Sequence, residues 1–216
     1  MVCVRHPAAF VASYLDPILH KFRWHLPDLA GQPALLEDYF NKDARFFDIE
    51  PEDPVTGAAV LWWALNRVLL DQCARHTDWI IVVHEELCKA PMATFRNLFS
   101  QLGLRWNRRV ERVIRQRTGG HNRVQACAIH DHYRNSAALF EWRRDMLSRE
   151  DRQKVFNVTR DVALRIYPEE SFGLDEEARE SAADRPSTSM IVVRHNGQLQ
   201  PCDVAQASAE RLVGLR

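Results

Sequence analysis

Arg5 and Ser13 are the residues of this sequence whose types and spacing best suit the binding of an anion. Arg5 ends the apolar segment 2–4, and Ser13 follows eight residues later in a segment that begins with Pro7. Proline suits the first position of a helix, so we expect Ser13 about two turns into a helix. A guanidinium and a hydroxyl placed in this way can hold one phosphate. By spacing alone, the favoured alternative is an Arg5 in a surface ion pair and an exposed Ser13.

An arginine-rich segment is the second candidate for anion binding. Residues 105–123 hold seven arginines and one glutamate, a local charge of +6. Arg108, Arg112 and Arg115 share one face of an expected helix. They suit a wall for a polyanionic acceptor or for nucleotide phosphates. The alternative is a solvated face whose arginines pair with acidic residues of other segments.

Histidines and cysteines offer little further chemistry. His121, Cys127, His130 and His132 lie near one another in sequence, but no matching pair completes four zinc ligands at a familiar spacing. We therefore expect no metal. The five cysteines are scattered, odd in number and without a C-x-x-C pair. Such usage favours reduced thiols and a cytoplasmic location over a disulfide framework.

The elements that must position these side chains follow an α/β pattern. We expect strands at 2–4 and 79–83, because short continuous apolar runs are typical of buried parallel strands. Helices are expected from Pro7, over 58–74, and from Pro91 to a C-terminal cap at Gly103. Strands that alternate with helices predict a layered α/β domain.

The remaining segments carry weaker signals. Prolines and glycines mark 26–57 as a connection with short helical pieces. Ser148 opens a capping box before a last amphipathic helix. We expect a linker over 174–189 and a lone strand over 190–194 followed by a turn at 196–197. The structure of the tail 190–216 is otherwise unknown from the sequence.

Composition limits the classes of partner. The chain has 216 residues, of which 46% are hydrophobic, and its 29 basic and 29 acidic residues give a formal net charge of zero. A neutral chain has no global attraction to nucleic acid or to a membrane surface, so we expect no nucleic-acid partner. The apolar runs are too short to span a bilayer, and residues 1–20 lack the pattern of a signal peptide.

Residues 2–14, which read VCVRHPAAFVASY, resemble the 3′-phosphate-binding motif of sulfotransferases that use 3′-phosphoadenosine 5′-phosphosulfate (PAPS). That family has a hydrophobic strand, then Arg-Asp/Asn-Pro, then a helix with Ser eight residues after the Arg. Arg5, Pro7 and Ser13 match this pattern. His6 stands where the family has an acid or an amide, which affects the local turn rather than the phosphate contacts.

Two further segments resemble the same family in the same order. Residues 79–104 are similar to its unit of strand, Tyr-Glu-Asp-Leu, proline, helix and Leu-Gly-Leu, with His84 in place of Tyr and Glu86 in place of Asp. Residues 136–150 resemble its late segment, in which Trp-Arg precedes Leu-Ser and acidic residues. The three segments lie in the family's order, and the resemblance extends over residues 2–170.

The resemblance implies a fold, a cofactor and a reaction. It implies a sulfotransferase-like domain over residues 1–173, with the α/β fold of P-loop NTPases and a central parallel sheet. PAPS would be the sulfuryl donor and a hydroxyl of a carbohydrate or small metabolite the acceptor. Arg5 and Ser13 would bind the 3′-phosphate, with a further contact from Arg117 or from Arg134, between which the sequence does not decide.

One part of the family's pattern is missing from these 216 residues. The glycine-rich loop that cradles the phosphosulfate at a helix N-terminus has no counterpart, since Gly119-Gly120 is the only glycine pair and follows no apolar strand. The sequence thus resembles a sulfotransferase domain that is incomplete at its N-terminus, and the alternative is an inactive remnant or nucleotide-binding module. The catalytic residues stay unknown, and the open sheet edge predicts self-association.

Overall fold

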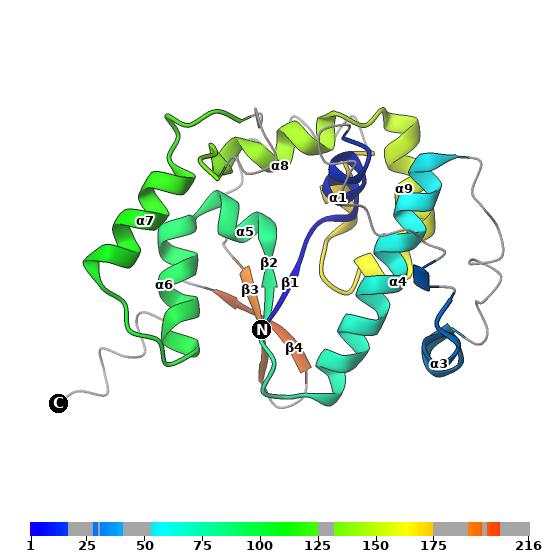
Figure 1. Ribbon diagram of the computed structural model, residues 1–216, viewed down its shortest axis with the longest axis horizontal. Coiled ribbons are helices and arrows are strands. Elements are labelled where there is room, and N and C mark those ends of the chain that lie inside the picture. Colours follow the sequence, from blue (N-terminus) through cyan, green and yellow to red (C-terminus); the bar gives the residue numbers. More distant parts are fainter. Residues whose placement is uncertain are drawn as a thin grey trace. The chain divides into compact units, whose positions relative to one another are not determined.

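The computed structural model describes residues 1–16, 28–29, 31–40, 53–124, 132–174, 190–195 and 198–203. They form many helices, one small parallel sheet and one antiparallel hairpin, so the predicted α/β class is confirmed at this level (Figure 1). The chain divides into two compact units. The sheet unit contains Met1–Arg5, Cys73–Trp142 and Glu180–Arg216, and the helical unit contains His6–Gln72 and Arg143–Arg179.

Two short parallel strands form the centre of the sheet unit. β1 (Val2–Val4) pairs with β2 (Ile81–Val83), and Val4 lies opposite Val83. All three β2 side chains are buried, as are Val2 and Val4 of β1. The predicted strand over 79–83 is therefore shorter than expected. Its partner β1 offers only three residues for pairing, and the Ile80 carbonyl accepts one more hydrogen bond, from the Val2 N–H (2.8 Å).

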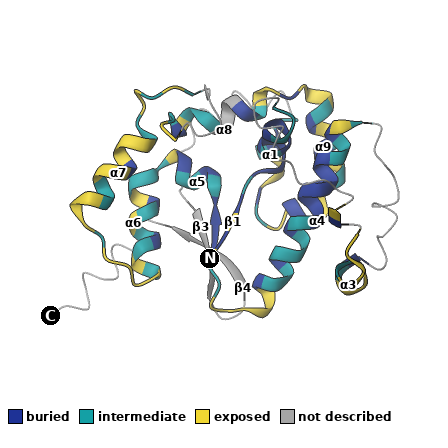
Figure 2. Ribbon diagram, in the orientation of Figure 1, coloured by how far each residue is buried: buried dark blue, intermediate teal, exposed yellow. Residues whose placement is uncertain are grey.

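Helices follow β2 directly. The sheet unit continues with α5 (His84–Lys89), α6 (Pro91–Gln101) and α7 (Arg108–Thr118), and α8 (Ser136–Asp145) begins within it. Gly103 ends α6 as the sequence predicted, with a φ of 65°. This left-handed conformation lets the Leu104 N–H donate to the Phe99 carbonyl (2.8 Å) and satisfies the helix end. α6 packs against α7, which is largely exposed (Figure 2).

The C-terminal strands form a hairpin. β3 (Met190–His195) pairs antiparallel with β4 (Gln198–Asp203), and Met190 lies opposite Asp203. The expected strand over 190–194 is therefore present but not alone, because β4 supplies its partner. The predicted turn at 196–197 and the predicted linker, apart from residue 174, lie outside the described residues.

The helical unit packs α1 (Pro7–Tyr14) against α9 (Arg149–Ala163). Ala8, Ala9 and Ala12 of α1 are buried, and such small side chains allow two helices to approach closely. Ser148 caps α9 as predicted, since its hydroxyl oxygen accepts the Asp151 N–H (3.0 Å). A 3₁₀ turn, η4 (Glu169–Phe172), follows α9 and buries Phe172.

The longest described helix also contributes to this unit. α4 (Pro54–Arg75) contains the predicted helix 58–74 and buries Trp62 and Trp63. The short helical pieces expected within 26–57 include α3 (Pro33–Leu35) and the π-helix η2 (Leu36–Phe40). None of the described helices has the length and hydropathy that a membrane span requires.

Candidate anion-binding site

Arg5 and His84 stand at the same edge of the small sheet. Arg5 follows the last residue of β1, and His84 follows the last residue of β2. Because β1 and β2 are parallel and Val4 lies opposite Val83, both residues leave the sheet at its carboxyl edge. Ligands of open α/β sheets bind at this edge. The observed pairing therefore confirms the predicted position of Arg5 at this edge, and the binding of an anion by Arg5 stays a prediction.

The His84 imidazole is held in its neutral form. Burial, and then the charge of Arg5, lower the pKa of His84 to about 4. The Glu85 carboxylate lies 3.9 Å from His84 Nδ1 and is itself buried. At neutral pH the positive charge of this edge therefore comes from Arg5 and not from His84, and Glu85 partly offsets it.

Cys88 contacts His84 one helical turn later. Cys88 Sγ lies 3.6 Å from His84 Nδ1, as expected for residues four apart on α5. A thiol beside an imidazole can be an activated nucleophile when the thiol pKa is low. Here burial, followed by the charge of Glu85, raises the pKa of Cys88 to about 12. The pair is thus a neutral thiol against a neutral imidazole, unsuited to nucleophilic catalysis.

Ser13 lies in the helical unit, on the buried side of α1.

His6, which departs from the sulfotransferase motif that residues 2–14 resemble, still caps α1, because its Nδ1 accepts the Ala8 N–H (3.2 Å). His6 thus performs the capping role that an acid or amide oxygen performs in other helices. The boundary between the two units falls between Arg5 and His6.

Arg117 and Arg134 are brought together by the backbone of the sheet unit. The Arg134 N–H donates to the Arg117 carbonyl (2.9 Å). The backbone of Arg134 also forms an isolated parallel β-bridge with the backbone of Arg123. The Arg134 Nε–H donates to the Val124 carbonyl (2.9 Å), so this guanidinium is already hydrogen-bonded to the backbone. The Arg117 side chain is instead exposed, on the last turn of α7. Of the two alternatives, Arg117 has the more accessible side chain.

The arginine-rich helix is largely exposed, as the solvated alternative predicted, but its ion pair lies within the helix and not with another segment. Arg115 forms an ion pair with Glu111 one turn earlier (2.8 Å). Arg108 and Arg112 are exposed beside this pair. Of the residues considered for a metal, Cys127 and His130 lie outside the described part of the chain.

No protein-family model, curated protein or solved structure that was compared with the chain matches it. Sequence reasoning did not find the contact between His84 and Cys88, because it predicted no helix directly after the strand. The available signal was their separation of four residues, which brings two side chains together only on a helix.

Proposed function

We propose that this chain is part of a PAPS-dependent sulfotransferase and that Arg5 binds the 3′-phosphate of the nucleotide. The observation that supports this most directly is the parallel pairing of β1 with β2, which puts Arg5 at the carboxyl edge of the sheet. His6 supports it further, since its cap on α1 preserves the strand–turn–helix order of the motif. Ser13, and either Arg117 or Arg134, remain predicted contacts of the same nucleotide.

In the proposed reaction the sulfuryl group passes from PAPS to a hydroxyl of a carbohydrate or small metabolite. Arg5 would anchor the nucleotide through charge-assisted hydrogen bonds to phosphate oxygens. Transfer also needs donors at the leaving phosphate and a base for the acceptor hydroxyl. His84, with a pKa of about 4, is a weak base at neutral pH.

A nucleotide-binding module without transfer activity is the second candidate. It is favoured by the His84 pKa of about 4, which makes the imidazole at the same sheet edge as Arg5 a weak base at neutral pH. Both candidates predict binding of 3′-phosphoadenosine 5′-phosphate (PAP). Only the first predicts transfer of ³⁵S-labelled sulfate from PAPS to an acceptor.

Calorimetric titration with PAP tests the proposal. We expect wild-type protein to bind PAP more tightly than adenosine 5′-phosphate, which lacks the 3′-phosphate. Arg5→Ala should weaken PAP binding at least tenfold, because a bidentate contact to phosphate is lost, and should remove the preference over adenosine 5′-phosphate. Arg5→Lys, which keeps the charge without the planar fork, should fall between them.

The matched control is Arg108→Ala, an exposed arginine of the same unit. It should leave the PAP affinity within about twofold of wild type, apart from a small effect of net charge. Equal affinities of the wild type and Arg5→Ala for PAP, with both proteins folded by circular dichroism, would contradict the proposed site.

A further inference from the structure

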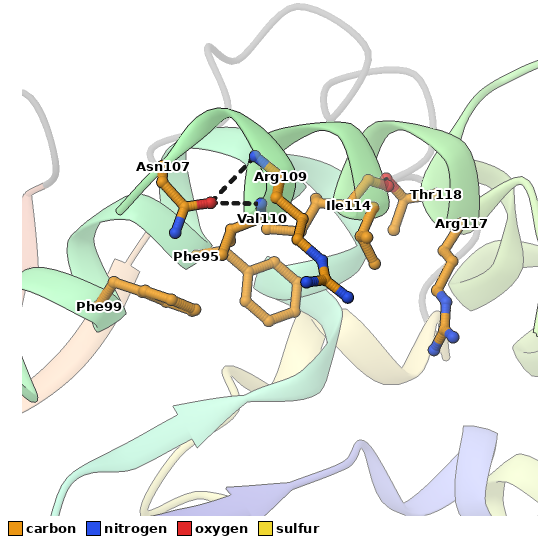
Figure 3. A pocket seen from close by; sticks show the side chains of 9 residues that line it. Phe95, Phe99, Asn107, Arg109, Val110, Ile114, Arg117 and Thr118 are labelled. Carbon is orange, nitrogen blue, oxygen red and sulfur yellow. Dashed lines mark hydrogen bonds between the residues drawn. The ribbon is translucent and has the colours of Figure 1, made fainter. Parts of the chain in front are cut away.

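A cavity of about 520 Å³ lies between α6 and α7, inside the sheet unit (Figure 3). Its volume is in the range of sites for small organic ligands. Most of its wall is apolar: Phe95 and Phe99 come from α6, and Val110, Val113 and Ile114 come from α7. Val113 is 40% exposed, so part of this apolar wall faces the opening rather than the core.

Two arginines also line the cavity, beside its apolar wall. Arg109 and Arg117 both line the cavity and stand eight residues apart, which is about two helical turns. Figure 3 shows that both side chains extend from α7 toward the side on which the Phe95 ring lies. No carboxylate lines the cavity among the described residues. The only acidic residue of α7, Glu111, is bound to Arg115.

The local sequence explains why α7 presents two different surfaces. Val110, Val113 and Ile114 are three and four residues apart and fall on one side of the helix. Arg109 and Arg117 flank that apolar side, whereas Arg108 and Arg112 line a separate surface with Glu111. The helix start is fixed by Asn107, whose Oδ1 accepts the N–H groups of Arg109 and Val110 (3.0 Å each).

We infer that this cavity binds a small anionic amphiphile: an organic molecule with an aromatic or aliphatic body and an acidic group. The apolar wall would take the body, and Arg109 or Arg117 would bind the carboxylate, sulfonate or phosphate. Both parts of the ligand follow from the lining, because an apolar wall alone selects no charge and arginines alone select no body. The inference does not depend on the proposed sulfotransferase function.

Two fluorescent probes with the same apolar body test both parts. 8-Anilinonaphthalene-1-sulfonate carries a sulfonate, and N-phenyl-1-naphthylamine lacks it. We expect wild-type protein to bind the sulfonate more tightly. The double variant Arg109→Gln/Arg117→Gln should weaken binding of the sulfonate about tenfold and leave binding of the neutral probe within about twofold. Val113→Trp should weaken the binding of both probes, because the indole would occupy part of the cavity.

The matched control is Arg108→Gln/Arg112→Gln, which removes the same charge from the same helix but on the other surface. It should change the affinity for the sulfonate by less than about twofold. A loss equal to that of the first double variant would overturn the inference, because general attraction would then explain binding. Unchanged binding of both probes by Val113→Trp would also overturn it.

Two further results would contradict the inference by showing another occupant. Displacement of the sulfonate probe by PAP in direct competition would assign the cavity to the nucleotide. Binding of the probe that appears only on dilution of the protein would assign it to a second copy of the chain. We expect neither, because an Arg117 that binds the amphiphile leaves Arg134 as the further contact of the nucleotide, and PAP affinity should be the same in wild type and in Val113→Trp. Failure of the amphiphile site would thus be distinguishable from failure of the nucleotide site.

Discussion

His6 Nε2 lies 3.0 Å from Ser171 Oγ, and this contact joins residues 165 positions apart in sequence. The other ring nitrogen, Nδ1, accepts the Ala8 N–H, so the ring hydrogen must be on Nε2 and Nε2 donates to the Ser171 oxygen. Ser171 in turn donates to the Pro168 carbonyl (2.6 Å). One fully buried side chain therefore caps α1 and fastens the segment that follows α9.

Replacement of His6 should separate these two roles. His6→Ala should lower the free energy of unfolding by about 3 kcal/mol, because the cap and the ring contacts with Tyr167 and Phe172 are both lost. His6→Asn keeps an acceptor for the Ala8 N–H and should cost about 1 kcal/mol less. Urea unfolding followed by circular dichroism measures both. Ser171→Ala is the control: it should destabilise wild type more than it destabilises His6→Asn, and equal losses would contradict the assigned hydrogen bond.

A buried ion pair gives the second prediction. Arg143 Nη1 lies 2.7 Å from Asp16 Oδ2, with side chains only 4% and 12% exposed. Asp16→Asn should lower the free energy of unfolding by about 3 kcal/mol, because the buried Arg143 guanidinium loses the negative charge of Asp16. The matched control is Asp145→Asn, which breaks the exposed pair with Arg144 and should cost less than about 1 kcal/mol. Equal losses of unfolding free energy for the two variants, measured by urea unfolding, would contradict the prediction that burial makes the Asp16–Arg143 pair the more important one for stability.

Local signals in the sequence were sufficient for the ends of several helices. Gly103 and Ser148 were predicted as caps, and both act as caps in the structure. A cap depends on one backbone conformation or one side chain within a few residues, so its cause is present in the local sequence. Pro7 as the start of a helix is predictable for the same reason.

Contacts between distant residues could not be predicted in the same way. The length of β2 depends on β1, which is 77 or more residues away in the sequence and pairs over only three positions. His6–Ser171 and Asp16–Arg143 join segments whose approach depends on the packing of α1 against α9. In the candidate site, the position of Arg5 at the sheet edge could be predicted from the strand that precedes it. The neutral state of His84 could not, because it depends on burial that only the fold provides.

The titration of His84 should make stability depend on pH. Its pKa is lowered from 6.5 to about 4 by burial and by Arg5. As the pH falls, His84 is therefore protonated near pH 6.5 in the unfolded chain but only near pH 4 in the folded protein. The stabilisation is therefore present above pH 6.5 and is lost as the pH falls toward 4. Because the side chain is 34% exposed, we expect a loss of only about 1–2 kcal/mol. Unfolding by urea from pH 7 to pH 4 measures it, and His84→Gln should show a correspondingly flatter dependence.

Removal of the Arg5 charge should shift this titration in a predictable direction. Arg5→Gln removes the second cause of the low His84 pKa and leaves burial, the larger cause, in place. The His84 pKa should therefore rise from about 4 toward its ordinary value without reaching it, and the pH-dependent loss of stability should become smaller. Nuclear magnetic resonance of ¹³C-labelled histidine follows the pKa directly, with the spectrum of His84→Gln assigning the signal. Arg108→Gln, with the same change of charge on exposed α7, should leave this pKa unchanged. A His84 pKa that is the same in wild type and in Arg5→Gln would mean that the Arg5 charge does not act on the end of β2. That result would contradict the assignment of Arg5 to an anion site at this edge of the sheet.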